Sequence, residues 1–475
     1  MKKLTILKAF SWVAFGNVIT KPLWMLLIIF AAKKLGSEQF GIYYYALSIV
    51  LLATIIVDFG FDYILIQRIA KNKNKLSNYL SAISFYRIIN FIIVLIFLSI
   101  LNLFFPRESG IQTKAIIILL FFQFTVITLT SIKNSISAIE RFSAFSQMMI
   151  FEKGLLTLFG FVSLWLFPDI ISFLSALLIA NFLTIVFLIV ILFKKFDFRI
   201  VKPTKILLAE ILRDSFPLLL MNIFVMIYFR IDVVLLNHFL NNKEIIGIYG
   251  SIHRIIEMFL LIPSILMSTF YPIIIRLYDE NKTRAFQIVD TVIKVMLSTS
   301  IVIALIFTVY AFELNKFMFG QEYIEGYRGL KYIIWTIVPL GVNFILGYLL
   351  ISINKQKFLA ITLFIASVVN ITLNVFLIPK LSFVGTSITA LVTEIIIFIF
   401  YSYFSIKYFG NTKLFASVSK FILLLIIFYF SFNGLLLLGV VKWLTFILSM
   451  LFMFVIAFVL KIYGKEDYKI IVNKI

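Results

Sequence analysis

The stretch PLWMLLIIFAAKKLGSEQFGIYYYALSIVLLATIIV (residues 22–57) places two apolar runs on either side of a short turn that carries lysines, glycine and glutamate. Runs of about 20 apolar residues are long enough to cross the hydrocarbon core of a bilayer as α-helices. The same pattern recurs throughout the 475 residues, which are 62% hydrophobic and only 14% charged. Soluble domains have about 25% charged residues. The sequence therefore predicts an all-α polytopic membrane protein.

The net charge and the metal-ligating residues narrow the classes of function. Lys and Arg total 43 against 22 Asp and Glu, the formal net charge is +21, and there are no cysteines and two histidines. Many of the cations lie in short breaks beside apolar spans, where Lys and Arg set the topology and attract anionic lipids. We therefore expect contact with anionic membrane lipids, and we expect no nucleic acid, no metal site and no bound cofactor.

The alternation of apolar runs and polar breaks predicts about fourteen transmembrane helices. They are 9–32, 40–66, 82–105, 114–138, 149–167, 169–193, 212–239, 246–275, 288–311, 330–353, 357–378, 384–406, 415–433 and 441–461. If both termini are cytoplasmic, the inner breaks hold most of the loop Lys and Arg, as the positive-inside rule requires. The longest break, 194–213, is too short for a soluble domain. Any activity must therefore lie among the helices of a multi-pass protein.

An internal repeat relates the first two spans to the seventh and eighth. The turn GSEQFGIY (36–43) aligns without a gap with NKEIIGIY (242–249), and PDIISF (168–173) resembles PKLSF (379–383). A parallel repeat of this kind indicates two six-helix lobes related by an axis along the membrane normal. The alternative, that apolar helices simply look alike, stays open. The predicted domains are an N-lobe at 1–193, a basic cytoplasmic linker at 194–213, a C-lobe at 214–406, and two helices with a cytoplasmic tail at 407–475.

Fourteen spans arranged as six plus six plus two resemble the multidrug/oligosaccharidyl-lipid/polysaccharide exporter superfamily, and within it the Wzx-type O-antigen flippases. The motifs that carry the resemblance are Leu35–Tyr43 with Ala46-Leu47, Asp58-Phe59-Gly60, Ala138–Phe142, Arg230-Ile231-Asp232, Ile378-Pro379-Lys380 and Gly385–Ala390. The resemblance implies a flippase of the bacterial cytoplasmic (inner) membrane. Its implied cargo is an undecaprenyl-diphosphate-linked oligosaccharide, such as an O-antigen repeat unit for lipopolysaccharide or another surface polysaccharide. Alternating access would carry this lipid-linked oligosaccharide to the outer leaflet, and a polysaccharide polymerase and a chain-length regulator are the implied protein partners.

Ionisable residues inside the predicted spans mark candidate sites, because a charge at mid-bilayer costs about 2.5–3.5 kcal/mol on insertion scales and usually faces an interior cavity. The candidates for contact with substrate in the lumen are Lys21, Arg87, Lys133, Arg230, Arg254 and Lys294. The candidates for ion coupling or structural pairing are Asp58, Asp62, Asp232, Glu257 and Glu394. Lys21 precedes Pro22, which removes a helix hydrogen bond, so this cation lies at an expected bend.

Several of these residues keep two interpretations. Arg254 and Glu257 lie three apart on one helix face and can form a structural pair instead of contacting substrate. Asp58 can carry a coupling proton or pair with a neighbouring cation. Lys294 lies near an interface, where lysines often snorkel. Taken together, the surplus of Lys and Arg favours a cavity for a diphosphate, since these side chains bind phosphate oxygens.

The leading hypothesis is a flippase, not an enzyme, driven by an H+ or Na+ gradient or by consumption of the substrate on the far side. A lipid II flippase and a drug/cation antiporter of the same superfamily are the alternatives. A polysaccharide polymerase or a glycosyltransferase is the alternative of a different class, but the sequence has neither a large outer loop nor a cytoplasmic Asp-x-Asp. It also lacks a Gly-x-x-x-x-Gly-Lys-Ser/Thr loop, which excludes an ATPase of that type.

Overall fold

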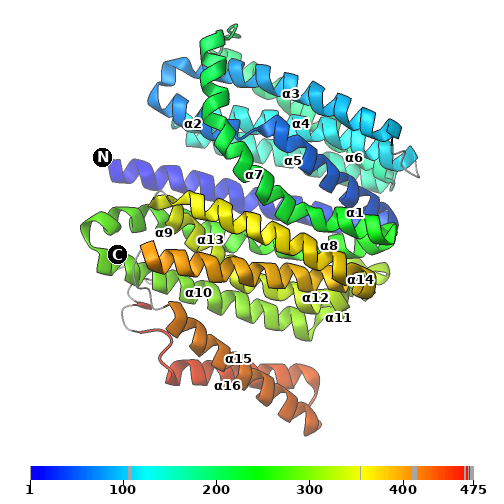
Figure 1. Cartoon of the computed structure of the whole chain (residues 1–475), viewed down its shortest axis with the longest axis vertical. Helices are drawn as coiled ribbons and strands as arrows, with labels where there is room; N and C mark the ends of the chain where they lie inside the picture. The colour runs from blue at the N-terminus through cyan, green and yellow to red at the C-terminus, as the bar shows by residue number, and fades with distance from the viewer. Residues whose placement is uncertain are drawn as a thin grey trace. The chain divides into compact units, whose positions relative to one another are not determined.

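The computed structural model describes residues 2–104, 110–353, 355–408, 414–464, 467–468 and 470, and this part of the chain is helical and has no β-strand (Figure 1). The α-helices are α1 (Lys2–Asp58), α2 (Phe61–Lys71), α3 (Leu76–Phe104), α4 (Gly110–Ala138), α5 (Phe142–Leu166), α6 (Ile170–Lys195), α7 (Lys205–Leu240), α8 (Lys243–Phe259), α9 (Leu261–Glu280), α10 (Lys282–Val309), α11 (Ala311–Phe319), α12 (Tyr327–Ile333), α13 (Ile337–Ser352), α14 (Gln356–Tyr408), α15 (Leu414–Leu437) and α16 (Lys442–Val459). Short 3-10 turns are η1 (Lys73–Lys75), η2 (Gln321–Gly326) and η3 (Ile334–Thr336). The predicted all-α fold is confirmed.

Fourteen membrane crossings can be traced through the described part of the chain. Twelve helical segments there are long and apolar enough to cross a membrane. One of these segments, Phe15–Lys71, includes α1 from Phe15 onward, and another is the 53-residue α14. Each of these two helices is bent at a residue with non-helical backbone angles. Gly36 (φ 74°, ψ 169°) bends α1 and Ser382 (φ 53°, ψ −140°) bends α14. Each bent helix contains two crossings, which brings the count to the predicted fourteen.

Two predicted spans are broken where the apolar pattern is continuous. The span 40–66 breaks at Phe59 and Gly60, which both have positive φ (51° and 75°), and α2 leaves in a new direction. A Cβ at residue 60 would lie 2.7 Å from Cβ of Leu218 in α7, so glycine also permits a close helix approach. The span 246–275 divides between α8 and α9 at Leu260. Hydropathy does not report such breaks, because the residues on both sides are apolar.

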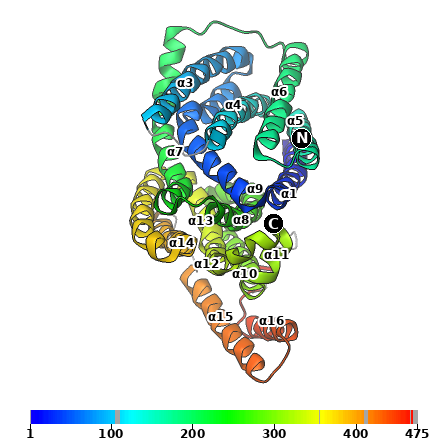
Figure 2. The same ribbon diagram turned by 90° about the vertical axis from the view of Figure 1, so that its right-hand side faces the viewer.

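Contacts divide the chain into two units, and the first comprises Met1–Arg254, Ala311–Leu330 and Leu363–Thr389. In this unit α1 packs against α4, α5 and α7, while α4 packs against α6. Figure 2 shows α3, α4, α5 and α6 grouped beside α1. Buried apolar side chains from α2, α3, α4, α6 and α7 form one cluster that holds these helices together.

The second unit comprises Ile255–Tyr310, Lys331–Thr362 and Ala390–Ile475. Helix α10 packs against α9, α13 and α15, and α15 lies beside α16 (Figures 1 and 2). A Cβ at Gly341 of α13 would lie 2.3 Å from Cε of Met296, so glycine allows α13 to approach α10 closely. The two units cut across the predicted lobes, whose boundaries stay a prediction. Residues 471–475 of the predicted tail lie outside the described residues.

Candidate functional site

The two turns that carry the repeated Gly-Ile-Tyr sequence lie directly against each other in the first unit. A Cβ added to Gly41 would lie 1.8 Å from the backbone oxygen of Lys243, and one added to Gly247 would lie 1.9 Å from the backbone oxygen of Ser37. Both distances are far below van der Waals contact. The contact therefore joins equivalent residues of the repeat, backbone to backbone, and requires glycine on both sides.

Two tyrosines that follow the first of these turns hold two of the predicted lumen cations. Arg254 of α8 donates a hydrogen bond to the Tyr43 hydroxyl (3.2 Å), and its guanidinium lies 5.4 Å from the centre of the Tyr44 ring. Arg230 of α7 donates to the Tyr44 hydroxyl (3.3 Å) and also lies over that ring, at 5.8 Å. We call these four residues the tyrosine–arginine cluster. Sequence reasoning selected the two arginines but missed the tyrosines, although both follow the repeated Gly-Ile.

A buried carboxylate lies next to this cluster. Asp232 is 4% exposed; it accepts hydrogen bonds from the Tyr249 hydroxyl and from the backbone N–H of Val233 (2.8 Å). Tyr249 is the repeat equivalent of Tyr43, so the two equivalent tyrosines have different partners. Asp232 is thus hydrogen-bonded within the protein, and a role in ion coupling stays a prediction.

Residues between the predicted spans 288–311 and 330–353 fold onto the same end of the first unit. Glu322 in η2 accepts hydrogen bonds from the backbone N–H (2.8 Å) and the hydroxyl (3.2 Å) of Ser37. The buried hydroxyl of Tyr323 donates to the backbone oxygen of Ala32 in α1 (2.8 Å). These bonds fix the bend at Gly36, so the turn is held from two sides.

A second cluster, rich in lysine, joins α1, α4 and α5. Glu152 is 1% exposed; Lys133 forms an ion pair with one of its carboxylate oxygens, and Lys153 lies 3.2 Å from the other. The Lys153 ammonium lies 5.0 Å from the centre of the Trp24 ring. Lys21 is exposed and lies one turn before Trp24 on the same face of α1. We call these five residues the basic cluster; it has three cations and a single carboxylate.

The predicted residues Asp58, Asp62 and Arg87 form a third cluster. Arg87 is 2% exposed, and its Nη2 lies 3.3 Å from Asp58 and 3.0 Å from Asp62. Its Nη1 donates to the backbone oxygen of Ile127 (3.0 Å) and to the Ser131 hydroxyl. Arg87 is therefore fixed among α1, α2, α3 and α4, and the cluster has one more carboxylate than it has cations.

Three predicted residues remain, Glu257, Lys294 and Glu394. In the second unit, Glu394 accepts a hydrogen bond from the Asn343 side chain (2.7 Å), and Lys294 pairs with Asp467 (2.7 Å). Glu257 is half-buried on α8, one turn after Arg254. Within the described part of the chain, no group of three His, Cys, Asp or Glu side chains could hold a metal ion.

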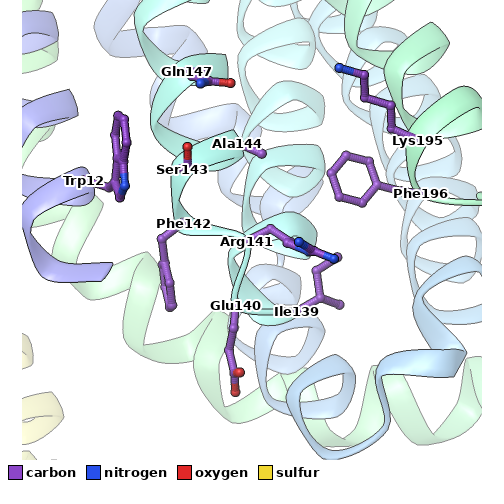
Figure 3. Close-up of a pocket in the computed structure, with 10 residues that line it drawn as sticks. All are labelled: Trp12, Ile139, Glu140, Arg141, Phe142, Ser143, Ala144, Gln147, Lys195 and Phe196. Atoms are coloured by element: carbon purple, nitrogen blue, oxygen red, sulfur yellow. The ribbon is translucent and has the colours of Figure 1, made fainter. Parts of the chain in front are cut away.

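A hollow of about 860 Å³ lies in the first unit where α4 turns into α5. Figure 3 shows Trp12 and Phe142 on one side of it, Lys195 and Phe196 on the other, and Arg141 between them. Part of a resemblance motif, Ile139–Phe142, lines this hollow. Arginine and lysine bind phosphate oxygens, so the hollow offers groups suited to an anionic ligand.

Comparison with known proteins identifies the fold. Residues 6–278 match the family described as "Polysaccharide biosynthesis protein", and residues 217–376 match the MatE family. The structure of the lipid II flippase MurJ, in an inward closed conformation, is similar with a TM-score of 0.70 and 16% identity over 98% of this chain and 99% of that one. An inward-facing multidrug resistance transporter of the MATE family is similar with a TM-score of 0.66 and 15% identity, over 83% of this chain and 97% of that one. A transporter from Pyrococcus furiosus is similar with a TM-score of 0.59 and 15% identity, over 85% of this chain and 96% of that one. No curated protein matches the sequence significantly.

The fold is that of the multidrug/oligosaccharidyl-lipid/polysaccharide exporter superfamily, to which these solved structures belong, and the predicted resemblance is confirmed. The first family match spans more than half of the chain. The chain therefore belongs to the polysaccharide biosynthesis protein family, whose members and structural neighbours point to a membrane transporter or flippase.

Proposed function

We propose that the protein flips an undecaprenyl-diphosphate-linked oligosaccharide from the cytoplasmic to the outer leaflet of the bacterial cytoplasmic membrane, with both termini in the cytoplasm. The observation that carries the proposal is the basic cluster, where Lys133 and Lys153 pair with one carboxylate and Lys21 lies one helical turn before Trp24, against which Lys153 packs. Cations inside a membrane span are costly, and a diphosphate is the kind of ligand that offsets this cost. Membership of a polysaccharide biosynthesis family supports a saccharide on the other end of that diphosphate.

The tyrosine–arginine cluster closes the end that the charge distribution places outside. Arg230 and Arg254 are held by Tyr43 and Tyr44, and the two Gly-Ile-Tyr turns pack beside them. Opening of this end separates the turns and frees both guanidinium groups for the diphosphate as it passes. The protein is thus a transporter and not an enzyme, and a polysaccharide polymerase with its chain-length regulator receives the product.

The third cluster, Asp58, Asp62 and Arg87, has one more carboxylate than it has cations, and this extra negative charge forms the site for the coupling ion. Asp58 is the more exposed of the two carboxylates that share Arg87, with 36% of its side chain accessible against 17% for Asp62. A proton or Na+ that binds Asp58 neutralises the surplus charge and weakens its attraction to Arg87. The ion gradient would act on the packing of α1 and α2 through this step.

A second candidate function is the flipping of lipid II. The MurJ structure is similar over 98% of this chain, which favours this candidate over a drug antiporter. Replacement of MurJ by this protein in cells depleted of MurJ separates the two candidates. Survival of those cells supports lipid II as the cargo. If the cells die although the protein still supports normal surface polysaccharide in its own host, the oligosaccharide is supported as the cargo.

The test of the proposal is deletion of the gene followed by mass analysis of polyprenyl-linked glycans. We expect single repeat units to accumulate on the cytoplasmic side, with loss of surface polysaccharide. Lys21→Ala and Lys153→Ala should each lower surface display by about tenfold or more, since hydrogen bonds to charged groups contribute about 1.5–3 kcal/mol. Lys75→Ala, in the exposed turn η1, is the matched control and should leave display unchanged. Normal display in both lysine variants would contradict the role of the basic cluster.

A further inference from the structure

An apolar groove runs along the first unit between α3, α4 and α6. Its volume is about 930 Å³, within the range of about 300–1,000 Å³ that is typical of ligand sites. Phe85 and Ile88 of α3 and Ile179 and Phe182 of α6 line it, and all four are exposed. The groove is therefore an open slot on the surface of a membrane-spanning helix bundle, where the neighbouring molecules are lipids.

The position of the groove along the helices fits a lipid of one leaflet. Its α6 residues extend from Leu178 to Phe193, which corresponds to about 23 Å at 1.5 Å per residue. One end lies at the last turn of α6, beside the first turns of α3. The slot thus starts at the predicted cytoplasmic surface and covers more than half of the ~30 Å hydrocarbon core. An acyl chain that descends from the cytoplasmic leaflet has this direction.

A basic strap crosses that end of the groove. We use this name for residues 196–204, which run as an extended arc from α6 to α7 (Figure 2). The backbone N–H groups of Arg199 and Val201 donate to the hydroxyls of Ser77 (3.1 Å) and Ser81 (3.2 Å) at the start of α3, which pins the strap across α3. Lys202 lines the groove itself.

The strap presents charge and apolar surface together. Arg199, Lys202 and the adjacent Lys205 are exposed and form no ion pair with any described residue, and Asp197 is the one acidic residue between Lys194 and Lys205. Ile200, between the first two cations, is 80% exposed. A segment with exposed Ile and cations is suited to the headgroup layer of an anionic membrane.

We propose that this groove and strap form a binding site for an anionic phospholipid of the cytoplasmic leaflet, with an acyl chain between α3 and α6 and the phosphate at Arg199 and Lys202. The two parts of the site have complementary chemistry, because the slot is apolar where the chain would lie and cationic where the headgroup would lie. The site lies within the first unit and contains no residue of the basic cluster, although Arg87 of the third cluster forms part of its wall. The identity of the cargo therefore does not determine whether this lipid binds.

The test measures lipid retained by the purified full-length protein, by native mass spectrometry after exchange into phosphatidylglycerol or phosphatidylcholine. We expect preferential retention of phosphatidylglycerol. The double substitution Arg199→Gln and Lys202→Gln should lower its affinity about 25-fold, since each cation near an anionic surface contributes about fivefold. Lys71→Gln with Lys75→Gln removes the same charge from exposed positions in α2 and η1, outside the groove, and should change affinity by no more than about twofold.

A second pair of variants tests the acyl slot. Ser84→Phe fills the groove from α3 and should reduce retention of both lipids, whereas Ser99→Phe places the same ring on an exposed part of α3 away from the groove. Equal retention of the two lipids, or full retention in Ser84→Phe, would overturn the proposal. Displacement of phosphatidylglycerol by an equal concentration of undecaprenyl phosphate would also overturn it, because the groove would then belong to the cargo.

Discussion

The direct packing of the two Gly-Ile-Tyr turns predicts that Gly41→Ala opens the end of the protein at which they meet. The new methyl group would lie 1.8 Å from the backbone oxygen of Lys243 and 2.9 Å from the backbone nitrogen of Gly247. Ordinary contact begins at 3.4 Å, so the new Cβ and the backbone oxygen of Lys243 must separate by about 1.6 Å. Gly41 lies in a helical segment where alanine is otherwise favourable, so the clash alone determines the effect.

The magnitude follows from the cost of overpacking, which is typically about 1–3 kcal/mol. Because both obstructing atoms belong to backbone, no side-chain rotation relieves the clash. A loss of 1–3 kcal/mol in the closed arrangement raises the open fraction by about 5- to 150-fold. Gly247→Ala should act in the same way. The double variant should destabilise the closed arrangement by less than the sum of the two single variants, because one separation of the turns relieves both clashes.

Cysteine labelling in intact cells measures this opening, because the chain has no cysteine of its own. Ser251→Cys places a thiol on α8 at a fully buried position next to the contact. The reaction rate of this thiol with a membrane-impermeant maleimide should rise by about 5- to 150-fold, like the open fraction, when Gly41→Ala is added. Gly154→Ala is the control, since a Cβ there meets nothing within 4 Å. An unchanged rate in Gly41→Ala would refute direct packing of the turns.

Three further predictions concern charges and hydroxyls. Lys133→Ala leaves buried Glu152 with one cation fewer and should destabilise the protein by about 3–5 kcal/mol in detergent melts, with partial recovery when Glu152→Gln is added. Tyr43→Phe keeps the ring but removes the hydroxyl that accepts from an arginine, so transport should fall by less than in Tyr43→Ala, as a liposome flipping assay can measure. Burial raises the pKa of Asp467, but hydrogen bonds from Lys294 and two further donors lower the pKa by more, and the net shift is downward. Docking of the C-terminal segment should therefore be stable above the ordinary carboxyl pKa and be lost as pH falls through the lowered value, which protease accessibility can follow; Asp467→Asn should remove that dependence.

Hydropathy predicts the crossings well because each needs a long apolar run, and all fourteen are found. It misses the break at Phe59 and Gly60, since positive φ is a property of the backbone that leaves the apolar average unchanged. The residues of the candidate site could likewise be predicted only in part from the sequence. A cation within a span is visible in the sequence, but the partner that defines its environment lies on another helix. Lys133 could therefore be selected, whereas its pairing with Glu152 of α5 could not.

The repeat explains both the symmetry and the asymmetry of the contact between the turns. The contact joins equivalent residues, as expected near the predicted axis between the repeats: Gly41 and Gly247 approach each other, and neither can carry a side chain. Three residues further on the repeat diverges, because Tyr44 is matched by Gly250, where a Cβ would lie 2.6 Å from Cγ of Tyr44. The second repeat thus has no side chain at Gly250, where the first repeat inserts the ring of Tyr44, and Arg254 stacks on that ring. The backbone packing of the two turns is therefore symmetric, whereas the contacts of both arginines are with the tyrosines of the first turn only. A substitution at Gly250 should displace Tyr44 and so disturb the tyrosine–arginine cluster, even if the contact at Gly41 stays intact.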